Sequence, residues 1–330
     1  MKKRVNKNGI APRSAPRSMD AATLYAQTFA APAFIVPDML LSGHLTLVAG
    51  RPKSWKTWLL LELTIAVASG RMFLERPIVT PGRVLFVELD DDRQQLHERL
   101  HLLVPRIGTD DHQALKNINF AHSLKPLRQG GLRDLEQQLK EALRLGKPYQ
   151  LVIIDPYMAI RSTRRSKDWV ADDYRELKEL RALCIKYQCT GVLACHLRKA
   201  GSPHAADKVL GTTGITAAVD SWWIVMDDPD NPKHKLVEVK GRSIPETMLR
   251  IGFNARGPNP GVYAVNEGIE LKAGPEGQEL LLLLKERGPL TPAEIATARH
   301  CSPNSVYQLL SRLRQRDMVL KEGTKYVYPS

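Results

Sequence analysis

Short apolar segments alternate with longer amphipathic ones between residues 44 and 265. The apolar runs His44–Ala49 and Arg83–Leu89 predict strands, and the periodic segment Thr57–Ser69 predicts a helix. Leu151–Ile154 is apolar throughout, which is typical of a strand buried on both faces of a parallel sheet. The alternation predicts an α/β fold with a mostly parallel sheet, flanking helices and right-handed crossovers.

Weaker segments complete this pattern. Helices are expected at residues 93–104, 131–144 and 168–188, and further strands at Ile118–Phe120, Val192–Ala194 and Trp222–Met226. The alternating segments Leu236–Lys240 and Met248–Phe253 predict an antiparallel hairpin that closes the sheet.

Composition divides the chain into four predicted parts. Residues 1–25 form a flexible arm, whose first 18 residues carry six basic and no acidic side chains. The arm is either a solvated tail or a segment that contacts phosphates. The α/β domain spans 26–255, a linker rich in glycine, proline and asparagine spans 256–276, and a small domain spans 277–330.

The small domain resembles a winged helix-turn-helix. Three helices are expected at residues 276–286, 292–298 and 303–316, and two short strands around the Glu322-Gly323 turn would form the wing. Asn304 and Arg312 on the third helix are candidate DNA contacts. Because such modules also bind proteins, a protein partner stays an alternative.

The strongest chemical signal follows the first strand. A P-loop reads G-x-x-x-x-G-K-[ST] between a strand and a helix. Three of its four specified positions agree here, and the candidate nucleotide-binding residues are Gly50, Arg51, Pro52, Lys53, Ser54, Trp55, Lys56 and Thr57. Lys56 should reach the β- and γ-phosphates of ATP, and Thr57 should bind Mg²⁺. Trp55 replaces the second glycine, so a loop that no longer works is the alternative interpretation.

Acids and a histidine follow later strands. Asp155 ends the strand Leu151–Ile154, where a Walker B acid would sit beside the metal. Glu88 and Asp90 lie at the end of another strand, where residues two positions apart would face the same side, and either could orient the attacking water. Asp92 is expected to cap the next helix. His196 ends a further strand and is either a γ-phosphate sensor or a structural residue.

The order of these motifs resembles the RecA-type hexameric ATPases, in particular the plasmid and mobile-element helicases of the RepA type. The resemblance covers about residues 30–255 and rests on GRPKSWKTW, VELDDDRQQLHERL, LVIIDP, CHLRKAG and VEVKGRSIPE. It implies a RecA-like fold and a hexameric ring. It also implies that Asp90 stands where the family has its catalytic glutamate, and the shorter side chain would slow hydrolysis.

The resemblance further implies that Lys240 and Arg242 enter the ATP site of a neighbouring subunit as a trans finger. A plain exposed hairpin is the alternative. The basic segment after Asp155 is a candidate DNA-contacting loop, with a solvated charged face as its alternative. The DNA-contacting candidates of the α/β domain are Arg161, Arg164, Arg165, Lys167, Arg198 and Lys199.

Net charge sharpens the choice of partner. A net charge of +13 and a pI near 9.6 favour an anionic partner. Since no apolar stretch approaches the ~20 residues of a spanning helix, we expect nucleic acid rather than a membrane. The four cysteines show no CxxC spacing and no export signal is recognised, so reduced thiols in a cytoplasmic protein are expected.

Two functions fit these features, and both use ATP and Mg²⁺. The first is an oligomeric ATP-driven motor on single-stranded or forked DNA, such as a helicase in replication or recombination of a mobile element. The second is a nucleotide-gated DNA-binding regulator with slow or no hydrolysis. A RecA-type ATPase with protein substrates is a third interpretation.

Overall fold

The structure is a computed structural model that describes residues 19–29, 31–107, 112–163, 168–197, 213–255, 260–268, 271, 273–315 and 318–329. The chain separates into two compact units, residues 1–32 and 33–330. Within the first unit, α1 (Ala21–Tyr25) begins at Asp20, whose carboxylate accepts the amide of Thr23 at 2.9 Å. The end of the predicted flexible arm is therefore helical. Across the described ranges, no helix is both long and apolar enough to cross a membrane.

A nine-stranded sheet forms the centre of the second unit, in the order β11-β10-β9-β8-β3-β7-β6-β4-β5. Six strands run parallel: β3 (Leu45–Gly50), β4 (Arg83–Glu88), β5 (Ile118–Ala121), β6 (Tyr149–Asp155), β7 (Thr190–His196) and β8 (Ser221–Asp227). Three more pair antiparallel: β9 (His234–Gly241), β10 (Ile244–Asn254) and β11 (Gly261–Glu267). The predicted mostly parallel sheet and its closing hairpin are confirmed.

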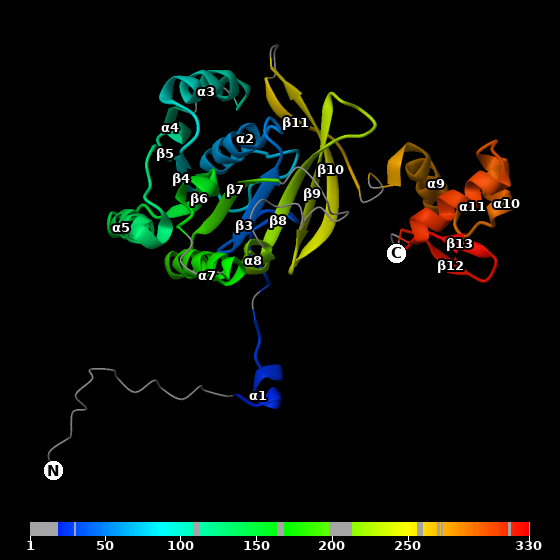
Figure 1. The fold of residues 1–330 in the computed structure, drawn as a ribbon, viewed down its shortest axis with the longest axis horizontal. Coiled ribbons are helices and arrows are strands. Elements are labelled where there is room, and N and C mark those ends of the chain that lie inside the picture. Colours follow the sequence, from blue (N-terminus) through cyan, green and yellow to red (C-terminus); the bar gives the residue numbers. More distant parts are fainter. Residues whose placement is uncertain are drawn as a thin grey trace. The chain divides into compact units, whose positions relative to one another are not determined.

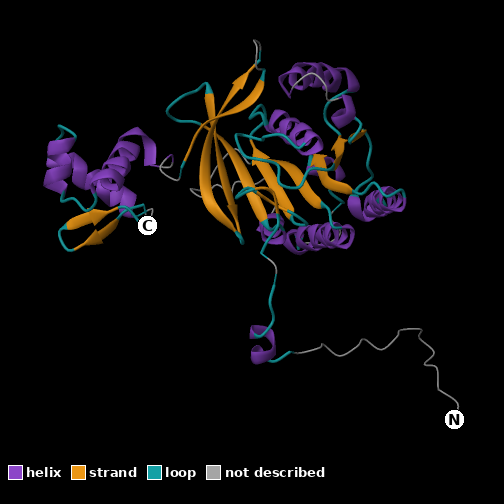
Figure 2. Cartoon of the chain, turned by 180° about the vertical axis from the view of Figure 1, so that it is seen from behind, coloured by secondary structure: helices purple, strands orange, loops and turns teal. Residues whose placement is uncertain are grey.

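Helices cover both faces of this sheet (Figures 1 and 2). One face carries α2 (Lys56–Ser69), α3 (Arg93–Ile107) and α4 (His112–Leu115). The other carries α5 (Gly131–Arg144), α6 (Tyr157–Ile160), α7 (Trp169–Tyr187) and α8 (Thr213–Ala218). A short 3₁₀ turn, Leu127–Gln129, precedes α5.

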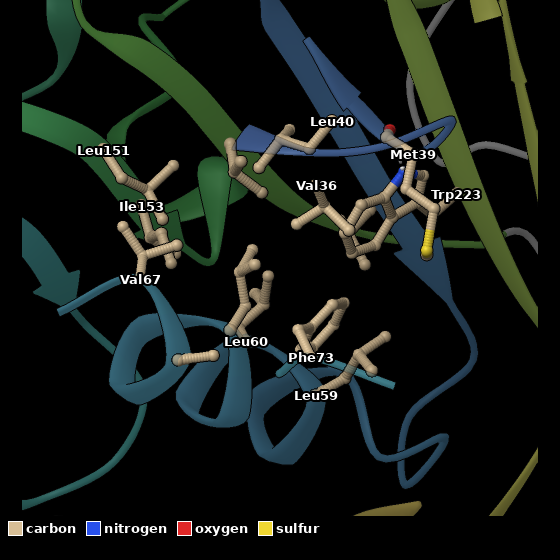
Figure 3. Close-up of a cluster of buried hydrophobic side chains, with 14 of the residues drawn as sticks. Val36, Met39, Leu40, Leu59, Leu60, Val67, Phe73, Leu151, Ile153 and Trp223 are labelled. Carbon is tan, nitrogen blue, oxygen red and sulfur yellow. Dashed lines mark hydrogen bonds between the residues drawn. The ribbon is translucent and has the colours of Figure 1, made fainter. Parts of the chain in front are cut away.

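The two faces hold separate apolar cores because side chains alternate along each strand. On β6, Leu151 and Ile153 face the α2 core, whereas Val152 and Ile154 face the α7 core. The α2 core also receives the small sheet of β1 (Phe34–Val36) and β2 (Leu40–Leu41). Figure 3 shows Leu59 and Leu60 of α2 packing among these side chains and Trp223. Both cores hold the strands in register and so fix where each strand ends.

Residues 261–267 differ from the prediction, because they form β11 rather than part of a linker. Strand β11 pairs with β10, and its Val262 is buried in the α2 core. The Val262 amide also donates to the Glu62 carboxylate of α2 at 3.1 Å. Residues 262–265 are an apolar run, but glycine, proline and asparagine around it placed the segment in the predicted linker.

The C-terminal residues form three helices and a two-stranded sheet around their own core. The elements are α9 (Gly274–Arg287), α10 (Pro292–Ala298), α11 (Pro303–Arg314), β12 (Leu320–Glu322) and β13 (Lys325–Val327). Thr291 and Glu294 form a reciprocal capping box at the start of α10, and Ser302 caps α11. Buried Leu280, Ile295, Leu310 and Val319 belong to the shared core.

Candidate functional site

The candidate site lies where the parallel strands end. Gly50 of β3 pairs with His196 of β7, and Glu88 of β4 pairs with Asp155 of β6. Because β7 lies between β3 and β6, His196 stands between the phosphate loop and Asp155 along this edge. Ligands of α/β sheets bind at the carboxyl ends of such strands. The structure therefore brings the predicted residues of four separate sequence segments to one edge.

The phosphate loop between β3 and α2 is tightly folded. A Cβ atom at Gly50 would lie 2.4 Å from the Ser54 hydroxyl oxygen, so only glycine fits there. Lys53 and Trp55 have φ values of 63° and 67°, in the left-handed region. Arg51, Pro52 and Lys53 are exposed, whereas Ser54 and Lys56 are buried. The loop thus holds a compact shape before α2 begins.

The Lys56 ammonium lies inside this loop. Its Nζ donates to the carbonyl oxygens of Gly50 at 3.0 Å and Arg51 at 2.9 Å. Burial lowers the pKa of Lys56, and the negative charge of Asp155 acts in the opposite direction. The Ser54 hydroxyl oxygen accepts from Nζ as well, at 3.4 Å. A buried cation held by carbonyl and hydroxyl oxygens would gain from an anion close by.

Asp155 connects the end of β6 to the start of α2. The Thr57 hydroxyl donates to Asp155 Oδ2 at 2.8 Å. Burial raises the pKa of Asp155 to about 6, against the effects of the Thr57 hydrogen bond and the Lys56 charge. This hydroxyl–carboxylate pair is the arrangement that holds Mg²⁺ in P-loop ATPases.

Glu88 fixes the turn that follows β4. Its Oε1 accepts the amides of Asp90 and Asp91, both at 3.0 Å, while the buried Oε2 has no hydrogen-bond partner among the described residues. Burial raises the pKa of Glu88 to about 7, and the nearby Asp155 adds to the effect. Asp91 pairs with Arg99 of α3, and Asp92 caps this helix through the amide of Gln95, as expected.

Asp90 lies beyond the strand and is exposed, so Glu88 and Asp90 do not extend from one strand face as their spacing predicted. The negative charge of Asp90 acts on three site residues. It adds to the raised pKa of Asp155, and it opposes the lowering of the pKa values of Lys56 and His196 by burial. Asp90 is therefore the exposed acid of the site, and Glu88 is the buried one.

His196 has one nitrogen, Nδ1, that is buried without a hydrogen-bond partner in the described part of the chain. Burial and the positive charge of Lys56 lower its pKa, which favours the neutral imidazole. A neutral ring beside the phosphate loop can donate one hydrogen bond and accept another.

These groups fit ATP with Mg²⁺. The unpartnered Glu88 Oε2 and His196 Nδ1 both lie at the edge that carries Lys56. Among the described residues, no group of three or more histidine, cysteine or acidic side chains could hold a metal. Mg²⁺ in nucleotide sites needs only one or two protein groups, because phosphates and water complete its shell. Thr57 and Asp155 meet that requirement.

Trp55 packs sideways instead of entering the loop. Its ring stacks on Phe253 of β10, with 5.4 Å between centroids, and Phe253 also lies 5.0 Å from Trp58. The Lys235 ammonium lies 5.2 Å from the Trp55 ring centroid. These contacts offset the cost of a left-handed tryptophan. Sequence reasoning missed Phe253 and Lys235, since no local pattern links the end of one strand to a distant loop.

Two predicted site residues lie at the opposite end of the sheet from their own phosphate loop. Lys240 pairs with Glu246 at 2.8 Å, and Arg242 donates to the carbonyl oxygen of Ala217 at 3.0 Å. The backbone amide of Arg242 donates to Asp220 O, beyond the start of β8. The structure does not bring these residues to the phosphate loop of the same chain.

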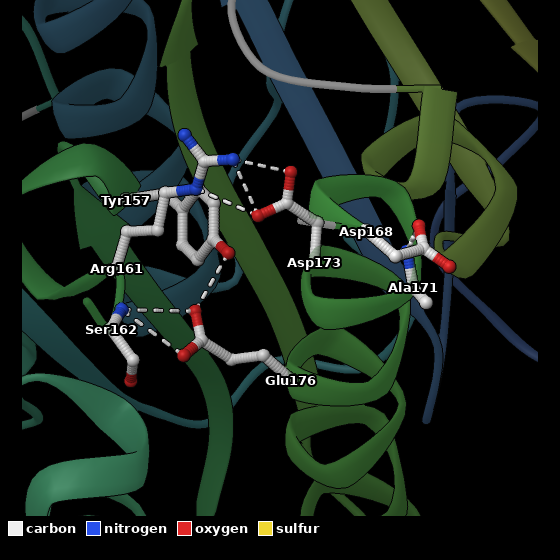
Figure 4. Close-up of polar contacts among 7 residues, drawn as sticks. All are labelled: Tyr157, Arg161, Ser162, Asp168, Ala171, Asp173 and Glu176. Atoms are coloured by element: carbon white, nitrogen blue, oxygen red, sulfur yellow. Dashed lines mark hydrogen bonds and ion pairs between the residues drawn. The ribbon is translucent and has the colours of Figure 1, made fainter. Parts of the chain in front are cut away.

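Arg161 corrects a prediction. It was expected to contact DNA, yet its side chain is only 10% exposed and forms a bidentate pair with Asp173 of α7. Figure 4 shows the guanidinium facing that carboxylate, beside the Tyr157–Glu176 hydrogen bond. The other DNA candidates of the α/β domain lie outside the described residues: Arg164, Arg165, Lys167, Arg198 and Lys199.

The third C-terminal helix has one polar, exposed side. Asn304 and Arg312 are both exposed on α11, and Tyr307, Gln308, Ser311 and Arg312 line a shallow hollow there. Val306, Leu309 and Leu310 face the core of the module instead. The exposed side is therefore accessible to a partner.

A comparison with known protein families matches the part of the chain that contains the candidate site. A family described as AAA domain matches residues 10–202, which is more than half of the chain. This match includes the phosphate loop, Glu88, Asp90, Asp155 and His196. Lys240, Arg242 and the C-terminal module lie beyond it. No curated protein matches the chain.

Proposed function

The chain belongs to the AAA domain family of P-loop ATPases, and from this premise we propose that it is an ATP-driven motor on DNA built from several copies of the chain. One observation carries the proposal: Lys56, the Thr57–Asp155 pair, Glu88, Asp90 and His196 meet at one sheet edge. Nucleotide-binding ATPase activity follows from the family. DNA as partner, helicase activity and a role in a mobile element are the proposed additions.

In this proposal, the loop amides and the Lys56 ammonium bind the phosphates of ATP, and Thr57 with Asp155 holds Mg²⁺. When bound, Mg²⁺ neutralises phosphate charge. Lys56 already has a lowered pKa from burial, and a phosphate oxygen would give its ammonium an anionic partner. The neutral His196 ring is positioned to sense the γ-phosphate through a hydrogen bond.

Asp90 is the proposed acid that orients the attacking water. It is exposed to solvent, and its charge acts on Lys56, Asp155 and His196. Glu88 is a positioning residue, because its carboxylate holds the amides of Asp90 and Asp91. Since an aspartate is one methylene shorter than the family glutamate, slow basal turnover is expected.

Lys240 and Arg242 support assembly from several copies. Both are exposed at the sheet end opposite their own phosphate loop, so any ATP site that they serve belongs to another copy. A trans finger stabilises charge on the transferred phosphoryl group. A hexameric ring, as in RepA-type helicases, is the proposed arrangement.

The proposal of DNA as partner rests on charge and on the C-terminal module. The chain carries a net charge of +13, and phosphate contacts are the main source of affinity for nucleic acid. The three helices and two-stranded sheet resemble a winged helix-turn-helix, in which Asn304 and Arg312 of α11 would face the groove. Arg161 is left out of this proposal because its guanidinium already pairs with Asp173.

The test is ATP hydrolysis by purified protein with and without single-stranded DNA. We expect strong stimulation by DNA and a loss of at least about 100-fold in Lys56→Ala, because a buried cation facing the phosphates disappears. Lys140→Ala is the matched control, since Lys140 is exposed on α5 and is not part of the phosphate loop. Unchanged turnover in Lys56→Ala would refute the site, whereas turnover that DNA does not stimulate would refute the motor.

A second candidate is a nucleotide-gated DNA-binding regulator, favoured by Trp55 in the loop and by the short Asp90. A regulator should protect a defined duplex sequence in footprinting and bind ATP without turnover. A motor should prefer single strands or forks.

A further inference from the structure

Helix α3 carries two histidines one turn apart, in the sequence His97-Glu98-Arg99-Leu100-His101. Residues four positions apart lie on the same side of a helix. The Nε2 atoms of His97 and His101 are 3.0 Å apart, and the ring centroids are 4.3 Å apart at an interplanar angle of 60°. Both rings are exposed, and their Nε2 atoms are within hydrogen-bond distance of each other, so a bound ion would replace the proton between them.

From this geometry we propose that His97 and His101 form a surface site for a divalent transition-metal ion, of the class Zn²⁺, Ni²⁺ or Cu²⁺. Imidazole nitrogen is a preferred ligand of these ions. With metal–nitrogen bonds of 2.0–2.1 Å, two ligands are about 2.9 Å apart at 90° and about 3.3 Å apart at the tetrahedral angle. The separation in α3 lies between these values, so the rings need little movement to share one ion.

The surrounding side chains leave both rings available. Among the described residues, each histidine ring has its hydrogen bond and its ring contact with the other histidine. Glu98 accepts a hydrogen bond from the Gln94 amide at 3.0 Å, and Arg99 is turned away to Asp91. No neighbouring group of the described chain competes for the two nitrogens.

The same motif, H-E-x-x-H on a helix, binds zinc in metallopeptidases, where the glutamate is a general base. Peptidase activity is not part of this proposal. Within the described chain no third histidine, cysteine or acid joins the pair, so water would fill the other coordination positions. The proposed site only binds an ion, and the ion would link two side chains that lie one turn apart on α3.

The helix that would carry the ion follows the acidic turn of the candidate ATPase site. Helix α3 begins after Asp92, and its Arg99 holds Asp91. An ion that binds only the folded helix stabilises that helix by mass action. The proposal itself rests on α3 alone and does not depend on the proposed function.

The experiment uses the full chain without an affinity tag, after removal of metal with a chelator. Calorimetric titration with Ni²⁺ and with Zn²⁺ should give one ion per chain. His97→Gln and His101→Gln should each lower the affinity by at least about tenfold, since even the loss of a group that hydrogen-bonds a metal ligand has an effect of that size. Glutamine is a good helix former, so both variants should keep α3. His122→Gln is the control, since His122 is one of the seven histidines outside the pair.

A second measurement does not depend on variants. One equivalent of Cu²⁺ should give an electron paramagnetic resonance spectrum with two equatorial imidazole nitrogens in the unmodified chain, and with one in His97→Gln. Equal affinities in the unmodified chain and His97→Gln would overturn the proposal. So would an absence of binding, or a single-nitrogen spectrum in the unmodified chain.

Discussion

Buried carboxylates of the described chain occur in two kinds of surroundings. Away from the phosphate loop, most pair with an arginine: Asp173 with Arg161, Asp220 with Arg181, and Asp228 with Arg250. Glu176 accepts the Tyr157 hydroxyl at 2.8 Å and the Ser162 amide at 3.1 Å instead.

Glu88 and Asp155, at the carboxyl edge, have no ion pair with any described residue. Their pKa values are raised to about 7 and about 6, mainly by burial. Most buried acids away from the edge thus have a cation built into the fold, whereas these two do not. This difference is what we expect if Glu88 and Asp155 serve a ligand.

The largest expected effect comes from removing one partner of a buried ion pair. Asp173→Ala should lower the free energy of unfolding by about 3–5 kcal/mol, because it leaves the buried Arg161 charge without a partner. Denaturant titration measures this. Glu141→Ala removes an exposed partner of Arg144 and should leave the stability nearly unchanged, because solvent screens this pair. Equal losses in the two variants would contradict the comparison.

The next effect is the pH dependence that Glu88 gives to stability. Its folded pKa of about 7 lies above the usual 4.5, so the folded state keeps a proton that the unfolded state releases between these values. The free energy of unfolding should therefore fall as pH rises from about 4.5 through 7, by about 3 kcal/mol for this group.

Glu88→Gln should remove this contribution, so its stability falls less than that of the unmodified chain between pH 5 and pH 8. Denaturant titrations at both pH values measure the difference. Glu141→Gln, at an exposed position, is the control. Parallel pH profiles for Glu88→Gln and the unmodified chain would show that this carboxyl is not perturbed.

A third prediction distinguishes the two acids after β4. Asp90→Asn should lower kcat by about 100-fold, because general-base positioning is lost. Asp90→Glu should raise kcat a few-fold by restoring the family's longer side chain. Asp92→Asn keeps the cap of α3 and is the control, since asparagine caps as well as aspartate. If Glu88→Gln lowered kcat more than Asp90→Asn, Glu88 would be the acid that orients the water and Asp90 would not.

The smallest effect concerns Trp55, whose ring contacts the Phe253 ring and the Lys235 ammonium. Phe253→Leu keeps apolar volume but removes the ring, so it should raise KM for ATP by about two- to tenfold, equivalent to about 0.5–1.5 kcal/mol. Steady-state kinetics measures this. Phe120→Leu removes a ring from a pair elsewhere in the sheet and should leave KM unchanged.

The parallel strands and the phosphate loop were predictable because their signals are local. An apolar run predicts each strand, and the phosphate-loop motif is formed by residues that are adjacent in the sequence. Strand ends then follow, so Gly50, Asp155 and His196 were expected at one edge, and the structure brings them there.

Long-range contacts were not predictable in this way. Arg161 looked like part of a basic loop because its partner, Asp173, lies on the next long helix. The spacing of Glu88 and Asp90 implied one strand face, but β4 ends at Glu88, whose carboxylate holds the turn. Strand β11 contains a short apolar run at 262–265, but glycine, proline and asparagine around it placed these residues in the predicted linker.

The Trp55 stack has a consequence for spectroscopy. The chain contains five tryptophans, and one of them is part of the phosphate loop, with a phenyl ring and an ammonium group close to its indole. Indole emission responds to nearby charge and to ring contacts, so nucleotide entering the loop should change the intrinsic fluorescence. The ATP site therefore contains its own optical probe, and association can be followed in real time without a labelled nucleotide.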